Sequence, residues 1–128
     1  MKVILSENQV DKIPSEKLAD IFFGWFKLKY PNYTLNEKDE IVVNSDDNSD
    51  TQICFYFDED DDFYVSIDLI KLFFDRINVK SFDIGQIIKD QKGEPRKKFN
   101  NIMSILAKKH FGRNINNVYF HYHFSDDD

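Results

Sequence analysis

A chain of 128 residues with 41 % hydrophobic and 31 % charged side chains has an ordinary globular composition, so we expect one compact domain over residues 1–128. Its net charge is −6, and no stretch approaches the roughly 18 apolar residues of a membrane span, so no membrane partner is expected. Cys54 is the single cysteine, which excludes an intramolecular disulfide and favours a reducing compartment, the cytoplasm.

Charge is sorted along the chain. Residues 37–68 contain twelve Asp or Glu and one lysine, whereas residues 69–125 contain eleven Lys or Arg and four acids. Segregated charge creates a directional field that can steer a charged partner or mimic a polyanion. This sorting is the strongest functional signal in the sequence.

The first predicted element is a helix over residues 15–30. Ser15 is its expected N-cap, and Pro31 disfavours helical geometry just before it. Its buried stripe follows the three- and four-residue spacing of a helix: Leu18, Ile21, Phe22 and Trp25.

Strand-like alternation follows. Residues 40–44 form a short β-type run, and residues 52–67 alternate as a hairpin whose connector is five consecutive acids, 58–62. Residues 117–124 predict a C-terminal strand, with Val118 and Phe120 on one face and Tyr119 and His121 on the other.

Two further helices are predicted over residues 68–78 and 95–111. Pro95 suits the first turn of the second one, and Gly112 is a good terminator. Together the elements predict an α+β domain in which an antiparallel sheet of about four strands packs against two or three helices.

The acidic connector 58–62 invites a calcium hypothesis. An EF-hand loop requires glycine at its sixth position and glutamate at its twelfth, and neither position fits when counted from Asp46 or from Asp58. A looser cation site, a solvated hairpin tip and an electrostatic role towards a basic partner remain as alternatives.

His121 and His123 are the other candidate metal ligands, since residues two apart on a strand project from the same face. The nearest third ligands in sequence are His110, Asp126 and Asp128. No nucleophile elbow, phosphate-binding glycine loop or dinucleotide fingerprint occurs, so we expect neither an enzyme nor a cofactor. Cys54, inside a predicted strand, is expected to be an ordinary buried thiol.

The basic residues around helix 95–113 raise the question of nucleic-acid binding. Phosphate contacts need such cations, but lysines also flank the apolar stripe of any soluble amphipathic helix. With the overall acidity, direct nucleic-acid binding is the less favoured hypothesis. The side chains concerned are Arg96, Lys97, Lys98, Lys108, Lys109 and Arg113.

The segment that begins at Ser66 resembles the start of the second helix of acyl carrier proteins, in which a serine within an Asp-Ser-Leu motif carries phosphopantetheine. Val65 and Ile67 replace the two flanking residues of that motif here, and a predicted hairpin precedes the segment, unlike in an all-helical carrier. The resemblance therefore implies only that Ser66 is a candidate for modification.

The favoured hypothesis is a non-enzymatic interaction module that binds a basic, nucleic-acid-binding surface of a partner protein, such as a nuclease, a toxin or a CRISPR effector. In size and charge the chain resembles toxin-immunity proteins and phage inhibitors, which act in a bacterial or phage-infected host cell. The alternative is a nucleic-acid-binding or metal-binding protein that uses helix 95–113 with His121 and His123. A homo-oligomer that pairs acidic and basic segments is a third hypothesis. The predicted partner-binding residues are Asp46, Asp47, Asp50, Tyr56, Asp58, Glu59, Asp60, Asp61, Asp62 and Tyr64.

Overall fold

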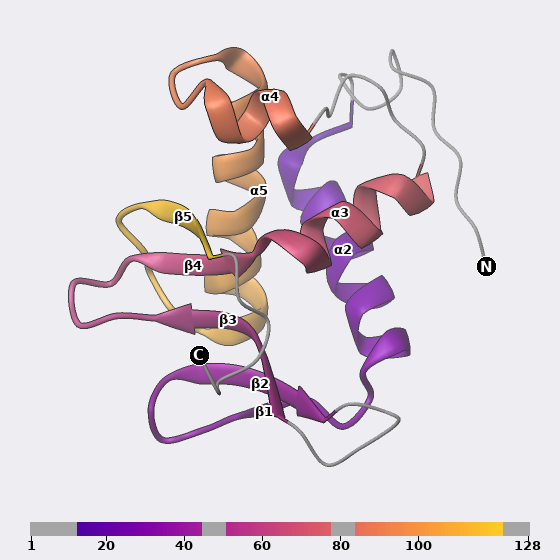
Figure 1. Cartoon of the computed structure of the whole chain (residues 1–128), viewed down its shortest axis with the longest axis vertical. Helices are drawn as coiled ribbons and strands as arrows, with labels where there is room; N and C mark the ends of the chain where they lie inside the picture. Colours follow the sequence, from indigo (N-terminus) through magenta and orange to yellow (C-terminus); the bar gives the residue numbers. More distant parts are fainter. Residues whose placement is uncertain (1–12, 45–50, 78–83, 122–128) are drawn as a thin grey trace.

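The structure is a computed structural model that describes residues 13–44, 51–77 and 84–121. In this part of the chain it contains four helices and five strands (Figure 1). In chain order they are α2 (Ser15–Lys29), β1 (Thr34–Leu35), β2 (Glu40–Asn44), β3 (Thr51–Phe57), β4 (Phe63–Ser66), α3 (Ile67–Ile77), α4 (Ile84–Lys89), α5 (Glu94–Phe111) and β5 (Val118–His121).

The strands form one sheet in the order β1-β2-β3-β4-β5. The first three pairs are antiparallel, but β4 and β5 run parallel. The predicted α+β class is confirmed and the sheet is mostly antiparallel, as expected, but the parallel pairing of β5 corrects the expectation of an antiparallel last strand. A parallel pair needs a long crossover connection, and α3, α4 and α5 supply it between β4 and β5.

The helices pack against one face of this sheet, and phenylalanine fills the space between them. Phe55 of β3 meets Phe22 and Phe26 of α2 at ring-centroid distances of 6.1 and 5.4 Å. Phe99 of α5 stacks on Phe120 of β5 at 5.1 Å. Phe26 is fully buried, whereas Ile21 and Trp25 of the predicted buried stripe are only partly buried. Since alternate residues of a strand project to opposite faces, the positions next to these phenylalanines point away from the helices.

The observed ends of the helices agree with the ends predicted from the sequence, with one correction. Ser15 is the first helical residue and Pro14 occupies the N-cap, so the prediction of Ser15 as the cap is wrong. Gly112 caps α5 in a left-handed backbone with φ of 71°, which confirms it as the terminator. Helix α4 lies between the two later predicted helices, 68–78 and 95–111. Residues 122–124 of the predicted last strand lie outside the described residues.

Candidate interaction surface

Residues 58–62, which join β3 to β4 and are called the acidic turn below, are fixed by one of their own carboxylates. Asp58 Oδ1 accepts hydrogen bonds from the amides of Asp60 and Asp62, at 2.9 and 3.0 Å. The Asp58 amide donates to the Asp62 carbonyl at 3.1 Å. Asp61 adopts a left-handed backbone with φ of 61°, which aspartate tolerates better than most residues. Asp58 is therefore a structural part of the turn.

The segment after α5 holds the acidic turn from outside. The Asn116 side chain donates to the Asp60 carbonyl at 2.8 Å, and the Asn116 backbone N–H donates to the Asp61 carbonyl at 2.9 Å. The Asn117 side chain donates to Asp62 Oδ1 at 3.1 Å. Within the described residues, the side chains of Glu59 and Asp60 are exposed and take part in no hydrogen bond or ion pair. The carboxylates of these two acids therefore face solvent and do not hold the turn in place.

The turn between β1 and β2 lies beside the acidic turn, because β2 pairs antiparallel with β3 and the Phe57 amide donates to the Asp39 carbonyl at 3.0 Å. Arg113 bridges the two turns. Arg113 Nη1 is 2.9 Å from Asp39 Oδ1, and Nη2 is 3.6 Å from Asp61 Oδ1. The guanidinium also lies over the ring of Phe57, 4.6 Å from its centroid. Sequence reasoning missed Asp39 as part of the site. The charge sorting placed it in the acidic segment, and antiparallel pairing of β2 with β3 brings the two turns together, but no sequence pattern indicates the contact of Asp39 with Arg113.

The acidic turn gathers negative charge at close range. One carboxylate oxygen each of Asp58, Asp60 and Asp62 lie within 4.8 Å of one another, the only such group of three potential metal ligands among the described residues. In the same described ranges, Arg113 is the one cation that forms an ion pair with the turn, and it contacts Asp61. Like charges at this spacing repel, so an incoming cation, whether a hard metal ion or a basic side chain, relieves the repulsion.

The predicted extension of the acidic patch by Asp46, Asp47 and Asp50 lies outside the described residues. The residues that flank this segment, Asn44 and Thr51, pair with each other. Their pair lies at the end of β3 opposite to the acidic turn.

The two predicted aromatic contacts, Tyr56 and Tyr64, lie on the sheet face away from the helices. They are cross-strand partners, and their rings stack with centroids 4.4 Å apart and planes 4° apart. Burial raises the pKa of both hydroxyls, and the nearby charge of Asp58 raises it further. Tyr119 of β5 continues the row, since it pairs with Tyr64 at a centroid distance of 5.4 Å. The sequence placed Tyr119 on this face, but we did not predict it as a site residue.

The predicted histidine pair is only half described. The His121 ring lies on the same face, 5.4 Å from the ring centroid of Tyr56. His123, Asp126 and Asp128 lie outside the described residues. His110, the third candidate ligand, belongs to the α2–α5 interface, where its Nε2 is 2.8 Å from Asp20 Oδ1.

The basic residues of α5 do not form one free surface. Arg96 is 4 % exposed and donates to the carbonyls of Ile87 and Val118, at 3.2 and 2.8 Å. Lys98 Nζ donates to the Ile13 carbonyl at 2.7 Å. Arg96, one of the cations named in the nucleic-acid hypothesis, is therefore buried, and its guanidinium ties α4, α5 and β5 together.

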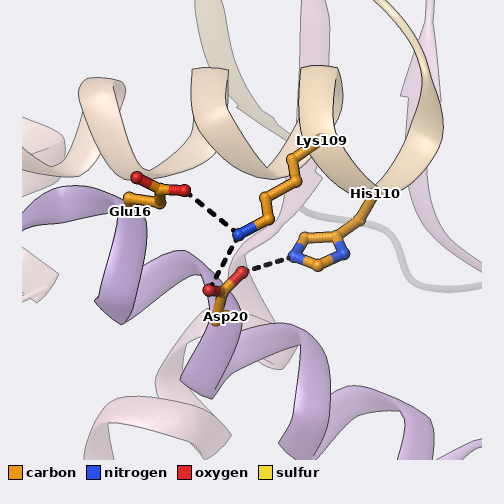
Figure 2. A network of polar contacts seen from close by, with 4 residues as sticks. All are labelled: Glu16, Asp20, Lys109 and His110. Atoms are coloured by element: carbon orange, nitrogen blue, oxygen red, sulfur yellow. Dashed lines mark hydrogen bonds and ion pairs between the residues drawn. The ribbon is translucent and has the colours of Figure 1, made fainter.

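Lys109 is also engaged within the chain. Its Nζ lies 3.1 Å from Glu16 Oε1 and 3.0 Å from Asp20 Oδ2, and Figure 2 shows these contacts beside the His110–Asp20 contact. Hydrogen bonds to Asp20 and Glu16 raise the pKa of Lys109. This network joins α2 to α5 and leaves less positive charge for phosphates.

The candidate nucleophiles are buried. Cys54 is fully buried, as predicted, and desolvation raises the pKa of its thiol to about 12, far from a reactive thiolate at neutral pH. Ser66 is 1 % exposed, and its Oγ accepts the Leu69 amide at 3.4 Å as a cap at the start of α3. Ser66 is therefore inaccessible to a modifying enzyme in this fold, which argues against the modification that the resemblance implied.

None of the helices in the described part of the chain combines the length and the apolar composition needed to cross a membrane. Compared with protein-family models, with curated proteins and with solved structures, the chain matches none.

Proposed function

We propose that this chain is a small, acidic, non-enzymatic interaction module that binds the basic, nucleic-acid-binding surface of a partner protein through the acidic turn. One observation carries the proposal: three carboxylates lie within 4.8 Å of one another on a turn that contacts a single arginine among the described residues. Such a turn attracts cations. A protein of this type inhibits its partner in the cytoplasm, as an immunity protein inhibits a toxin or a phage protein inhibits a host defence effector.

The geometry of the turn supports the mimicry of phosphates. Carboxylates on a fixed backbone can occupy positions that a basic groove provides for phosphate oxygens, and their field accelerates the encounter. The turn is held by hydrogen bonds to Asp58 and Asn116, so little conformational entropy is lost when a partner binds.

The alternative, nucleic-acid binding by α5, has less support. Arg96 is buried, and Lys98, Lys109 and Arg113 are engaged with carbonyls or carboxylates of this chain. A phosphate would have to compete for these cations.

The test is partner capture from a lysate of cells that naturally express the chain, with identification of captured proteins by mass spectrometry. The decisive variant is Glu59→Gln with Asp60→Asn (E59Q/D60N), since both side chains are exposed and the turn does not depend on them. The matched control is Asp68→Asn with Glu94→Gln (D68N/E94Q), which removes the same charge from exposed positions on α3 and α5.

We expect the wild type and D68N/E94Q to capture the same basic, nucleic-acid-binding protein, and E59Q/D60N to lose it. Added nucleic acid should displace the captured protein. Equal capture by all three forms, or a complex that nucleic acid does not disturb, contradicts the proposal.

A further inference from the structure

Three tyrosines form a continuous row across the sheet face opposite the helices. Tyr56, Tyr64 and Tyr119 are register partners on β3, β4 and β5. The first two rings are stacked, and the third is tilted by 34° at the edge of the sheet, where Tyr119 is 39 % exposed. Single exposed aromatic residues are ordinary, but a row on three adjacent strands makes a contiguous aromatic surface.

Acids border this row. Glu40 is the register partner of Tyr56 on β2, so the row continues into a carboxylate on that side. Asp58 lies close enough to Tyr56 and Tyr64 to raise the pKa values of their hydroxyls, after the larger effect of burial. An exposed aromatic ring, that of Tyr119, with negative charge near its row is complementary to cations that also stack.

Two guanidinium groups of this chain already lie over aromatic rings. Arg113 lies over Phe57 while it contacts Asp39 and Asp61, and Arg96 lies over Phe120 at 5.0 Å. A guanidinium is planar and can stack on an aromatic ring while its N–H groups bind a carboxylate, whereas a lysine ammonium is a strongly hydrated point charge. Nucleic-acid bases also stack on tyrosines, but the acids at the border repel their phosphates.

We propose that the sheet face away from the helices, Tyr56, Tyr64 and Tyr119 together with Glu40 and the acidic turn, is an arginine-selective docking surface for the basic partner protein. This inference rests on the proposed function and adds the chemistry of the contact. Arginine side chains of the partner bind the carboxylates of the turn, and one of them stacks on the exposed ring of Tyr119.

The test measures the affinity of the full chain for capped hexa-arginine and hexa-lysine peptides by calorimetry. Wild type should bind hexa-arginine about two- to fivefold more tightly for each stacked arginine, the range of an exposed cation–π contact. Tyr119→Ser should remove this preference, and Tyr119→Phe, which keeps the ring, should retain it. E59Q/D60N should weaken the binding of both peptides equally, because this variant removes charge alone.

Amide chemical shifts measured during the same titrations locate the contact even if Tyr119→Ser folds poorly. Hexa-arginine should shift the amides of Tyr64 and Tyr119 in the wild type more than hexa-lysine does. Equal affinities for the two peptides, shifts confined to the helices, or a preference retained in a folded Tyr119→Ser variant overturns the inference. The inference is also overturned if the wild type forms a dimer, or binds a single-stranded oligonucleotide, and Tyr119→Ser abolishes that interaction. Partner capture that depends on Glu59 and Asp60 without arginine preference overturns this inference alone and leaves the proposed function standing.

Discussion

Arg113 Nη1 lies 2.9 Å from Asp39 Oδ1, and this contact joins two residues 74 positions apart. The same guanidinium reaches Asp61, so it bridges the β1–β2 turn and the acidic turn, which the antiparallel pairing of β2 with β3 places at one end of the sheet. Among the described residues, carboxylates of two turns thus lie on either side of one arginine.

Replacement of Arg113 should destabilise the fold modestly. Arg113→Ala removes the ion pair with Asp39 and the stacking on Phe57, and a half-exposed pair of this kind contributes about 1–2 kcal/mol. Urea unfolding measures the loss, with Lys108→Ala, an exposed cation of the same helical region, as control. Equal stability of the two variants would show that Arg113 does not bridge the turns in solution.

Arg96 should matter far more than its exposed neighbour. Arg96→Met leaves the carbonyls of Ile87 and Val118 without their donor, and unsatisfied buried polar groups cost about 2–4 kcal/mol together. Lys97→Met, at a position where the side chain is 62 % exposed, should change the free energy of unfolding by less than about 0.5 kcal/mol. Similar values for the two variants would contradict the buried position of Arg96.

Two glycines on helices should respond to alanine with opposite signs. Gly112 has a φ of 71° and open space around its Cβ position, so Gly112→Ala should cost about 1–2 kcal/mol through the backbone alone. Gly24, inside α2, also has open space, and Gly24→Ala should stabilise the protein by about 0.5–1 kcal/mol. Thermal or urea unfolding tests the pair, and a shared sign would be inconsistent with these helix bounds.

The contact of α2 with α5 should weaken in acid. Hydrogen bonds from Lys109 and then from His110 hold the pKa of Asp20 below its ordinary value of 3.8. Since the folded value is depressed, this stabilisation is present above about pH 3.8 and is lost as the pH falls through the folded value. The stability difference between wild type and Asp20→Asn should therefore be largest near pH 5 and shrink towards pH 3. A difference that does not vary over this range argues that Asp20 is not ionised in that contact.

Local patterns predicted local structure well. Pro95, the apolar spacing of α5 and Gly112 delimit a helix that the structure confirms, and alternation predicted the hairpin on either side of the acidic turn. The direction of β5 escaped prediction because four alternating residues look the same in a parallel and an antiparallel pair.

The contacts of the candidate site were harder to predict than its composition. Five consecutive acids are visible in the sequence, but the contact of Asp39 with an arginine 74 positions away is not. The burial of Arg96 was hidden because a cation beside an apolar stripe usually faces solvent.

The most direct test of the central claim is a calorimetric titration of the captured partner with three forms of this chain at two salt concentrations. We expect E59Q/D60N to bind about tenfold more weakly than wild type, and D68N/E94Q to bind within about twofold of it. The wild-type affinity should fall as salt rises, since exposed charges carry the contact. Affinities that are equal for all three forms and insensitive to salt would contradict the claim that the acidic turn binds a basic partner.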